Sequence, residues 1–295
     1  NDKKVDIVLT PTKRSNTIIL DRLSGKPIFE YRLRKAPISI LPGEKTSKYQ
    51  PDLEIPEPFG KNTFSENDFW SFSNSELKKI RKKYENYNYG FYETYQLNRK
   101  NLQYSFNGGA EWMGASVDHV NNIMYVSSNN IPWEAYIEKI DSKKKEPPSY
   151  YSSFKRALIE KKYPISKPPW GTITAINLNN GKKIWQIPFG EYDELRSKGI
   201  QRTGTENFGG VTGTEGNLIF ATGTLDKKFY VFNSKTGDEL FSYKMPYIGS
   251  APPTTYRING KQYIIVHSTG GKTLMQGYPN IVENGNMLVA FSIKD

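Results

Sequence analysis

A short motif that recurs three times limits the folds open to this chain more than any other feature. Each copy has an apolar run, an Asp or Asn, a polar turn that ends in glycine, and a second run that ends in an aromatic residue. The copies occupy residues 17–29, 174–185 and 230–241. Glycine supplies the positive φ of a tight turn, and the Asp or Asn side chain can hydrogen-bond the turn backbone. The motif therefore predicts a β-hairpin repeated along the chain.

Repeated hairpins favour a stacked architecture, because one hairpin cannot bury both of its faces. Further apolar runs bounded by turn residues predict additional strands; they lie at 122–127, 217–222, 262–267 and 287–292. The 24 Gly, the 18 Pro and the 14% aromatic content agree with an all-β chain that is rich in turns. Strands at this spacing are typical of propeller blades, and the chain has room for about four blades. The expected fold is a partial β-propeller.

The regular pattern is interrupted twice. We expect one propeller domain over 1–295, with blade segments at 1–35, 109–129 and 170–295. The stretches 36–108 and 130–169 are rich in Pro and polar residues and are interpreted as irregular, partly helical insertions outside the propeller.

A short amphipathic helix is expected inside the first insertion. Ser73 and Glu76 have the spacing of a capping box, and Leu77, Ile80 and Tyr84 follow on one helical face. A second short helix is expected near 153–162.

Composition excludes several classes of function. The chain has no cysteine, so disulfides, thiolate metal sites and cysteine nucleophiles are ruled out. Its two histidines, His119 and His267, are too few for a histidine metal centre. The net charge of +11 raises the question of nucleic-acid binding. Because the densest basic runs lie in the insertions, they are interpreted as solvated surface, and no nucleic-acid partner is expected.

Several stretches resemble one enzyme family. The second copy of the motif has Ala175, Asn177, Gly181 and Trp185 at the spacing of the repeat found in enzymes that use pyrroloquinoline quinone (PQQ). Longer stretches resemble other segments of these enzymes; they are 11–22, 108–115, 190–195 and 203–210. The chain resembles the C-terminal half of a PQQ-dependent (quinoprotein) dehydrogenase, in the branch of the membrane-bound glucose dehydrogenases.

The resemblance implies a function as well as a fold. It implies about four blades of an eight-bladed propeller, with an N-terminal half as the missing partner. It also implies oxidation of a glucose-like sugar or an alcohol, with electrons passed from PQQ to a membrane quinone. A Ca²⁺ or Mg²⁺ ion is expected in the full-length protein, with its ligands outside this chain and no metal ligand within it. The implied location is the bacterial periplasm, at the inner membrane.

The resemblance further implies which residues meet the cofactor. In this family a Lys or Arg lies near the reactive carbonyl of PQQ, and Lys13 matches it in the segment that continues into Leu20-Asp21-Arg22. A fixed cation there would stabilise the negative charge that develops on the quinone oxygen. The other candidate cofactor-binding residues are Trp112, Asn207, Phe208 and Gly209.

No catalytic residue is expected within the chain itself. The general base of the family is an Asp that lies further upstream of the Lys segment than the residues before Lys13 reach. A base is needed to accept the proton of the substrate hydroxyl, so the chain alone is expected to be inactive.

The chain departs from the family near the expected cofactor site, with Ser15 and Met113 in place of Gly and Val211 in place of Pro. These changes leave open an alternative, in which the chain is a non-catalytic PQQ-repeat propeller that binds proteins as a scaffold.

Overall fold

Antiparallel sheets follow one another along the chain in the computed structural model, which describes residues 4–106, 108–140, 149–271, 278 and 284–293. One four-stranded sheet has the spatial order β13 (Lys183–Pro188), β12 (Gly171–Asn177), β7 (Ile123–Asn129) and β6 (Ala115–Asp118). The next consists of β14 (Val211–Gly213), β15 (Leu218–Ala221), β16 (Lys228–Asn233) and β17 (Glu239–Lys244). A three-stranded sheet follows, made of β18 (Thr254–Ile258), β19 (Lys261–Gly270) and β20 (Asn284–Ser292).

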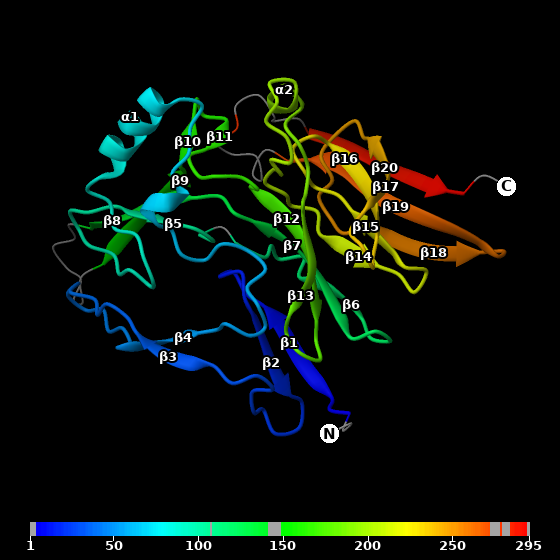
Figure 1. Ribbon diagram of the computed structural model, residues 1–295, viewed down its shortest axis with the longest axis horizontal. Coiled ribbons are helices and arrows are strands. Elements are labelled where there is room, and N and C mark those ends of the chain that lie inside the picture. Colours follow the sequence, from blue (N-terminus) through cyan, green and yellow to red (C-terminus); the bar gives the residue numbers. More distant parts are fainter. Residues whose placement is uncertain (1–3, 107, 141–148, 272–277, 279–283, 294–295) are drawn as a thin grey trace.

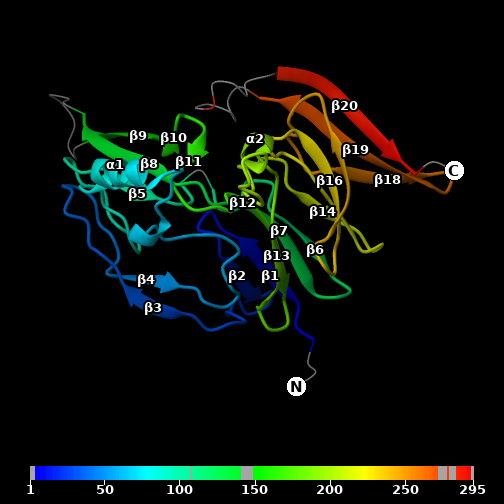
Figure 2. The ribbon, with the colours of Figure 1, turned by 45° about the horizontal axis from the view of Figure 1, so that its top comes forward.

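A two-stranded hairpin precedes these sheets. It pairs β1 (Ile7–Pro11) with β2 (Thr17–Asp21), and it lies beside the sheet of β6, β7, β12 and β13 in Figures 1 and 2. One face of the hairpin is the more buried, as the alternating burial along β1 and the start of β2 shows. The expected all-β class is confirmed.

Apolar layers join each sheet to the next, and these layers form the core of the partial propeller. Ile19 of the hairpin packs with Met124 and Val126 of the first four-stranded sheet. The opposite face of that sheet meets the second sheet in a cluster that includes Ile173 and Ile219. A third cluster joins the second sheet to β19 through Phe229 and Val266. This stacking buries the faces that a single hairpin would leave in water.

The turns of the repeated motif have the conformation that the sequence predicts. Gly25, Gly181 and Gly237 have φ values of 69°, 71° and 78°. In the second copy the Oδ1 atom of Asn177 accepts a hydrogen bond from the backbone N–H of Asn179 at 2.8 Å. In the first copy the same role falls to Asp21, which accepts from Ser24 N–H at 2.7 Å. The short polar side chain thus replaces a missing backbone partner at each tight turn.

The aromatic residue that ends the second motif joins two neighbouring sheets. The ring of Trp185 stacks on Tyr125 with centroids 6.0 Å apart. Its indole N–H donates to the backbone oxygen of Ser234, which follows β16 in the next sheet, at 3.0 Å. The aromatic residue at the end of this copy of the motif therefore links its own sheet to the next one.

The two insertions combine into one structure on the other side of the molecule (Figure 1). β5 (Asn101–Gln103) comes from the first insertion and pairs with β8 (Trp133–Lys139) of the second, which pairs with β9 (Tyr150–Arg156). Smaller elements complete this part of the chain: β3 (Arg32–Lys35) with β4 (Tyr49–Asp52), a 3-10 turn at Glu66–Asp68, and β10 (Leu158–Ile159) with β11 (Tyr163–Pro164).

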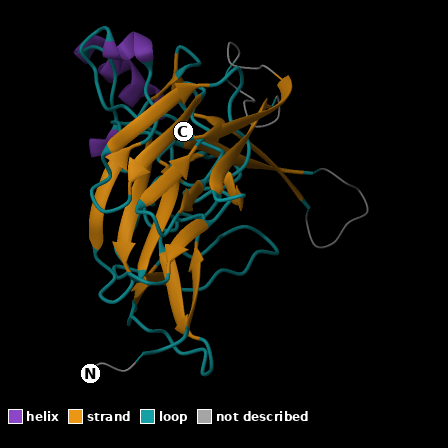
Figure 3. Cartoon of the chain, turned by 90° about the vertical axis from the view of Figure 1, so that its right-hand side faces the viewer, coloured by secondary structure: helices purple, strands orange, loops and turns teal. Residues whose placement is uncertain are grey.

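Both helices lie at one end of the molecule (Figure 3). The expected helix in the first insertion is confirmed as α1 (Asn74–Tyr84), where Ser73 accepts from the Glu76 N–H at 3.2 Å and Ile80 and Tyr84 are buried. The other is α2 (Asp193–Arg196), a single turn between β13 and β14. No helix of the described residues is both long and apolar enough to cross a membrane.

The helix expected near 153–162 is wrong. These residues form the end of β9, then β10 and a turn. Strand β8 offers a free edge, and β9 pairs with it over its whole length. A strand partner satisfies every second backbone group of β9 at once, so tertiary pairing outweighs the local helical pattern.

Candidate functional site

A group of polar residues, most of them buried and Lys13 exposed, lies where the first two sheets meet the insertions. We call it the polar cluster; it consists of Lys13, Glu111, Asn129, Arg156, Glu206 and Asn207. Strand β7 ends at Asn129, and Asn207 lies in the loop before β14. The backbone N–H of Asn207 donates to Asn129 Oδ1 at 2.8 Å, and Asn129 Nδ2 donates back to the Asn207 carbonyl at 2.9 Å. These bonds fix both amides.

The side-chain oxygen of Asn207 is left without a partner. Asn207 is 0% exposed, and its Nδ2 atom donates to Ser128 O at 3.1 Å. Its Oδ1 atom accepts no hydrogen bond within the described residues. A buried acceptor without a donor is costly, so this atom is suited to a ligand that brings an N–H or O–H group.

Glu111 adds a carboxyl group whose charge is disfavoured. Its Oε1 atom accepts from Asn129 Nδ2 at 2.9 Å. Burial, reinforced by the nearby charge of Glu206, raises the pKa of Glu111 to about 7, although Lys13 and Arg156 act in the opposite direction. Near neutral pH this carboxyl is therefore poised between its two protonation states.

Glu206 and Arg156 form a buried ion pair at the back of the cluster. Arg156 Nε donates to Glu206 Oε2 at 2.6 Å, and a second guanidinium nitrogen donates to Oε1 at 3.0 Å. Their side chains are only 5% and 1% exposed. The guanidinium also lies 4.6 Å from the ring centre of Trp133 and 4.9 Å from that of Tyr278. Such a bidentate, sandwiched pair is rigid.

Lys13 lies on the loop of the β1–β2 hairpin, and the backbone ties that loop to the cluster. The Lys13 carbonyl accepts from Gly109 N–H at 2.7 Å, and the Gly109 carbonyl accepts from Asn129 N–H at 2.8 Å. The Lys13 side chain is exposed, yet it is near enough to Glu111 to lower that residue's pKa. Lys13 is therefore the solvent-accessible cation of the cluster.

Two departures from the family fall on this same loop and its neighbour. Ser15 has φ 62°, a conformation that favours glycine, which accounts for the glycine that the family usually has there. Its Oγ atom lies 3.3 Å from Ser105 Oγ and so contacts the insertion. Met113 packs against Gly210, where an added Cβ would lie 2.8 Å from the Met113 Cβ. Both side chains thus make contacts with neighbouring parts of the chain.

The structure brings some of the expected cofactor residues together and separates others. Lys13 and Asn207 belong to the polar cluster. Trp112 is 89% exposed, and Glu111 beside it reaches the cluster instead. Phe208 is 1% exposed and packs in the core formed with the insertions. A Cβ on Gly209 would overlap the Thr222 carbonyl, so protein packing already requires glycine there. Contact of these residues with a cofactor stays a prediction.

Four members of the cluster were not among the candidates from the sequence: Glu111, Asn129, Arg156 and Glu206. Asn129 lies two residues after the strand predicted at 122–127, and Glu111 and Glu206 lie inside the stretches 108–115 and 203–210 that carry the resemblance, so these three had a weak signal. Arg156 had none, because it lies 50 residues from Glu206 in a segment interpreted as an irregular insertion. Among the described residues, no three acidic or histidine side chains lie close enough to hold a metal ion.

The stability of the protein should report the raised pKa of Glu111. Between pH 4.5 and about 7 the Glu111 carboxyl keeps its proton in the folded chain, whereas in the unfolded chain, where its pKa has the ordinary value of 4.5, it loses that proton. This contribution is present at low pH and is lost as the pH rises through about 7. The free energy of unfolding, measured with urea, should therefore decrease between about pH 5 and about pH 7. Glu111→Gln should make that decrease smaller, leaving the part due to Asp226 and Glu93, whose pKa values burial also raises, and the exposed Glu215→Gln should not change it. An unchanged pH profile in Glu111→Gln would contradict the assignment.

The fold and the cluster together define a class. Stacked antiparallel sheets, turns with Asp or Asn before glycine, and an aromatic that bridges adjacent sheets are features of a propeller built from PQQ-type repeats. The family model described as "Glucose/ethanol/alcohol dehydrogenase, beta-propeller domain" of the PQQ enzymes matches residues 1–264. The chain belongs to this family.

Curated relatives are similar over nearly the whole chain. The large subunit of glycerol dehydrogenase from Gluconobacter oxydans is 28% identical over 92% of this chain and 41% of its own length. The quinate/shikimate dehydrogenase (quinone) of Acinetobacter baylyi is 26% identical over 97% of this chain and 38% of its own. The quinoprotein glucose dehydrogenase of Escherichia coli is 23% identical over 100% and 39%. The chain thus spans about two fifths of the length of these relatives.

Solved structures share the fold. A quinohemoprotein alcohol dehydrogenase from Pseudomonas putida superposes with a TM-score of 0.57 and 15% identity, over 98% of this chain and 36% of the other. A europium-containing methanol dehydrogenase gives a TM-score of 0.56 at 16% identity, over 99% and 45%. The prediction of a partial quinoprotein propeller in the branch that includes glucose dehydrogenases is confirmed.

Proposed function

We propose that the chain is the C-terminal part of a PQQ-dependent dehydrogenase that oxidises a sugar or an alcohol and passes the electrons to a quinone. The single observation that carries this proposal is the polar cluster, which combines the accessible Lys13, close enough to Glu111 to lower its pKa, with the unpaired side-chain oxygen of Asn207. Relatives named as dehydrogenases of glycerol, quinate and glucose favour this function over a protein-binding scaffold.

The described residues fit a quinone that bears both hydrogen-bond donors and acidic groups. When bound, PQQ supplies a ring carbon that accepts hydride from the substrate carbon. Lys13 would place a cation beside the oxygen on which negative charge grows, from a loop whose backbone is held by Gly109. Asn207 Oδ1 would accept a hydrogen bond from a donor group of the ligand. Trp112, which is 89% exposed, would cover the edge of the ligand.

The rest of the machinery is proposed to lie outside this chain. The proton of the substrate hydroxyl would go to an Asp of the N-terminal half, and a Ca²⁺ or Mg²⁺ ion would be held there too. The location proposed for the complete protein is the periplasm, at the inner membrane. Cell fractionation that placed the protein in the cytoplasm would exclude that location.

Reconstitution tests the function directly. The complete protein, purified without cofactor, is mixed with PQQ and Ca²⁺ or Mg²⁺, and dye reduction is followed with glucose, glycerol or ethanol. Substrate-dependent reduction that requires PQQ is expected. A protein that neither binds PQQ nor reduces the dye with any of these substrates would instead support the scaffold.

A further inference from the structure

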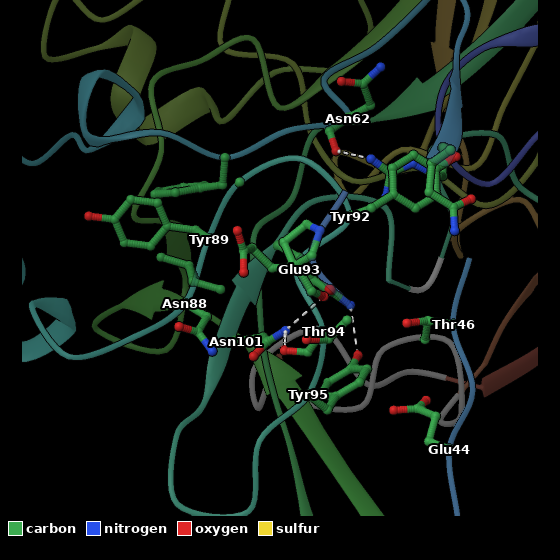
Figure 4. Close-up of a pocket in the computed structure, with 17 residues that line it drawn as sticks. Glu44, Thr46, Asn62, Asn88, Tyr89, Tyr92, Glu93, Thr94, Tyr95 and Asn101 are labelled. Atoms are coloured by element: carbon green, nitrogen blue, oxygen red, sulfur yellow. Dashed lines mark hydrogen bonds between the residues drawn. The ribbon is translucent and has the colours of Figure 1, made fainter. Parts of the chain in front are cut away.

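A pocket in the first insertion is separate from the polar cluster. It has a volume of about 220 Å³ (Figure 4) and shares no lining residue with that cluster, although Arg14, which also lines it, follows Lys13 in the sequence. A volume of this size suits a small ligand rather than a drug-sized one. Most of its lining side chains are polar or aromatic.

Two buried amides in this pocket have unsatisfied groups. Asn88 is 6% exposed and Asn101 is 1% exposed. Within the described residues, Asn88 Nδ2 has no acceptor and Asn101 Oδ1 has no donor. The Asn101 amide is oriented by its Nδ2 atom, which donates to the backbone oxygens of Glu93 and Thr94 at 3.3 and 3.4 Å. The lining of the pocket therefore contains one unpaired donor and one unpaired acceptor, the acceptor on an amide that is held in place, and each is costly to leave unpaired.

Further donors and aromatic faces surround these amides. The guanidinium of Arg14 lies 3.9 Å from the ring centre of Tyr92 and donates to Asn62 O at 3.1 Å, and no carboxylate of the described residues pairs with it. The hydroxyl of Tyr95 accepts from Gln103 Nε2 at 3.0 Å, so its own hydrogen remains to be donated. Glu93 brings a carboxylate to the same lining.

This chemistry selects among small ligands. A lining that carries both charges and neutral amides does not favour a simple anion or a simple cation. A hydroxyl group both donates and accepts, so vicinal hydroxyls would pair with Asn88 and Asn101 together. The C–H face of a sugar ring would pack on the tyrosine rings, as apolar surface does on aromatic side chains.

We propose that this pocket binds a polyhydroxylated ligand of monosaccharide size, at a site distinct from the polar cluster. None of the lining residues found in this chain belongs to the polar cluster. Binding should therefore persist in protein that lacks PQQ, and it can be measured independently of the proposed dehydrogenase activity.

Isothermal titration of PQQ-free protein with D-glucose tests the proposal. A saturable heat is expected for the wild type. Asn88→Leu removes the unpaired donor, so binding should weaken by about tenfold. Because the same change removes a buried unsatisfied group, the urea midpoint should stay equal or rise. Asn86→Leu, an exposed position of the same insertion, is the matched control and should bind as the wild type does.

Other outcomes would overturn the proposal. The absence of a saturable heat with D-glucose would mean that water fills the pocket. Equal binding by Asn88→Leu and the wild type would place the sugar elsewhere. A saturable heat with acetate and none with D-glucose would identify an anion site at Arg14. If Asn88→Leu fails to fold, Tyr95→Phe replaces it, and unchanged glucose binding there would count against the site. Dye reduction with added PQQ, measured in parallel, tests the dehydrogenase separately.

Discussion

Turnover of the complete, PQQ-loaded protein is expected to fall by on the order of a hundredfold or more when Lys13 is replaced by alanine. The accessible cation of the polar cluster would be lost, and with it the stabilisation of charge on the quinone oxygen. PQQ affinity should fall as well, because the cation also meets the oxidised quinone. The fold should survive, since the contact with Gly109 uses the Lys13 backbone. Dye reduction and PQQ titration measure the two effects.

Matched variants separate this role from a general effect of charge. Lys13→Arg keeps the cation and should retain more activity than Lys13→Ala, although the planar guanidinium changes the geometry. Lys26→Ala removes an exposed lysine beyond the same hairpin and should change neither quantity. If Lys13→Ala matches the wild type in turnover and in PQQ affinity, the assignment of Lys13 is wrong and the scaffold alternative is strengthened.

Removing Arg156 alone should destabilise the protein by about 3–5 kcal/mol, because Glu206 would be left buried without its partner. The expected variant is Arg156→Met, which keeps much of the volume between Trp133 and Tyr278. The double variant Arg156→Met with Glu206→Leu removes both charges and should recover most of the loss. The free energy of unfolding from urea titration measures each change.

A surface pair provides the control for this cycle. Lys82 and Glu85 lie 2.8 Å apart, but their side chains are 78% and 44% exposed. Lys82→Met should therefore change stability by less than about 1 kcal/mol. A cost for Arg156→Met no larger than that of Lys82→Met would show that the buried pair does not support the fold.

The repeated hairpins were predictable because their signals are local. Asp21 or Asn177 before a glycine of positive φ determines a tight turn through contacts within a few residues, whatever the rest of the chain does. Helix α1 was predictable for the same reason, since Ser73 caps it from the adjacent position. Buried strands were predictable from short apolar runs bounded by turn residues, such as the run at 122–127 that forms most of β7.

The insertions and most of the polar cluster were decided only by tertiary structure. The pairing of β5 with β8 and β9 joins segments that carry no shared pattern, and it overrode the helix expected near 153–162. Arg156 meets Glu206 only because that sheet brings it there. Glu111 rather than Trp112 points into the cluster, as burial and charge at this junction require. The sequence by itself determined the turns and strands, because the interactions that stabilise them join residues close together in the chain. The site depends on contacts between residues far apart in the chain, and these form only when the folded sheets pack against one another.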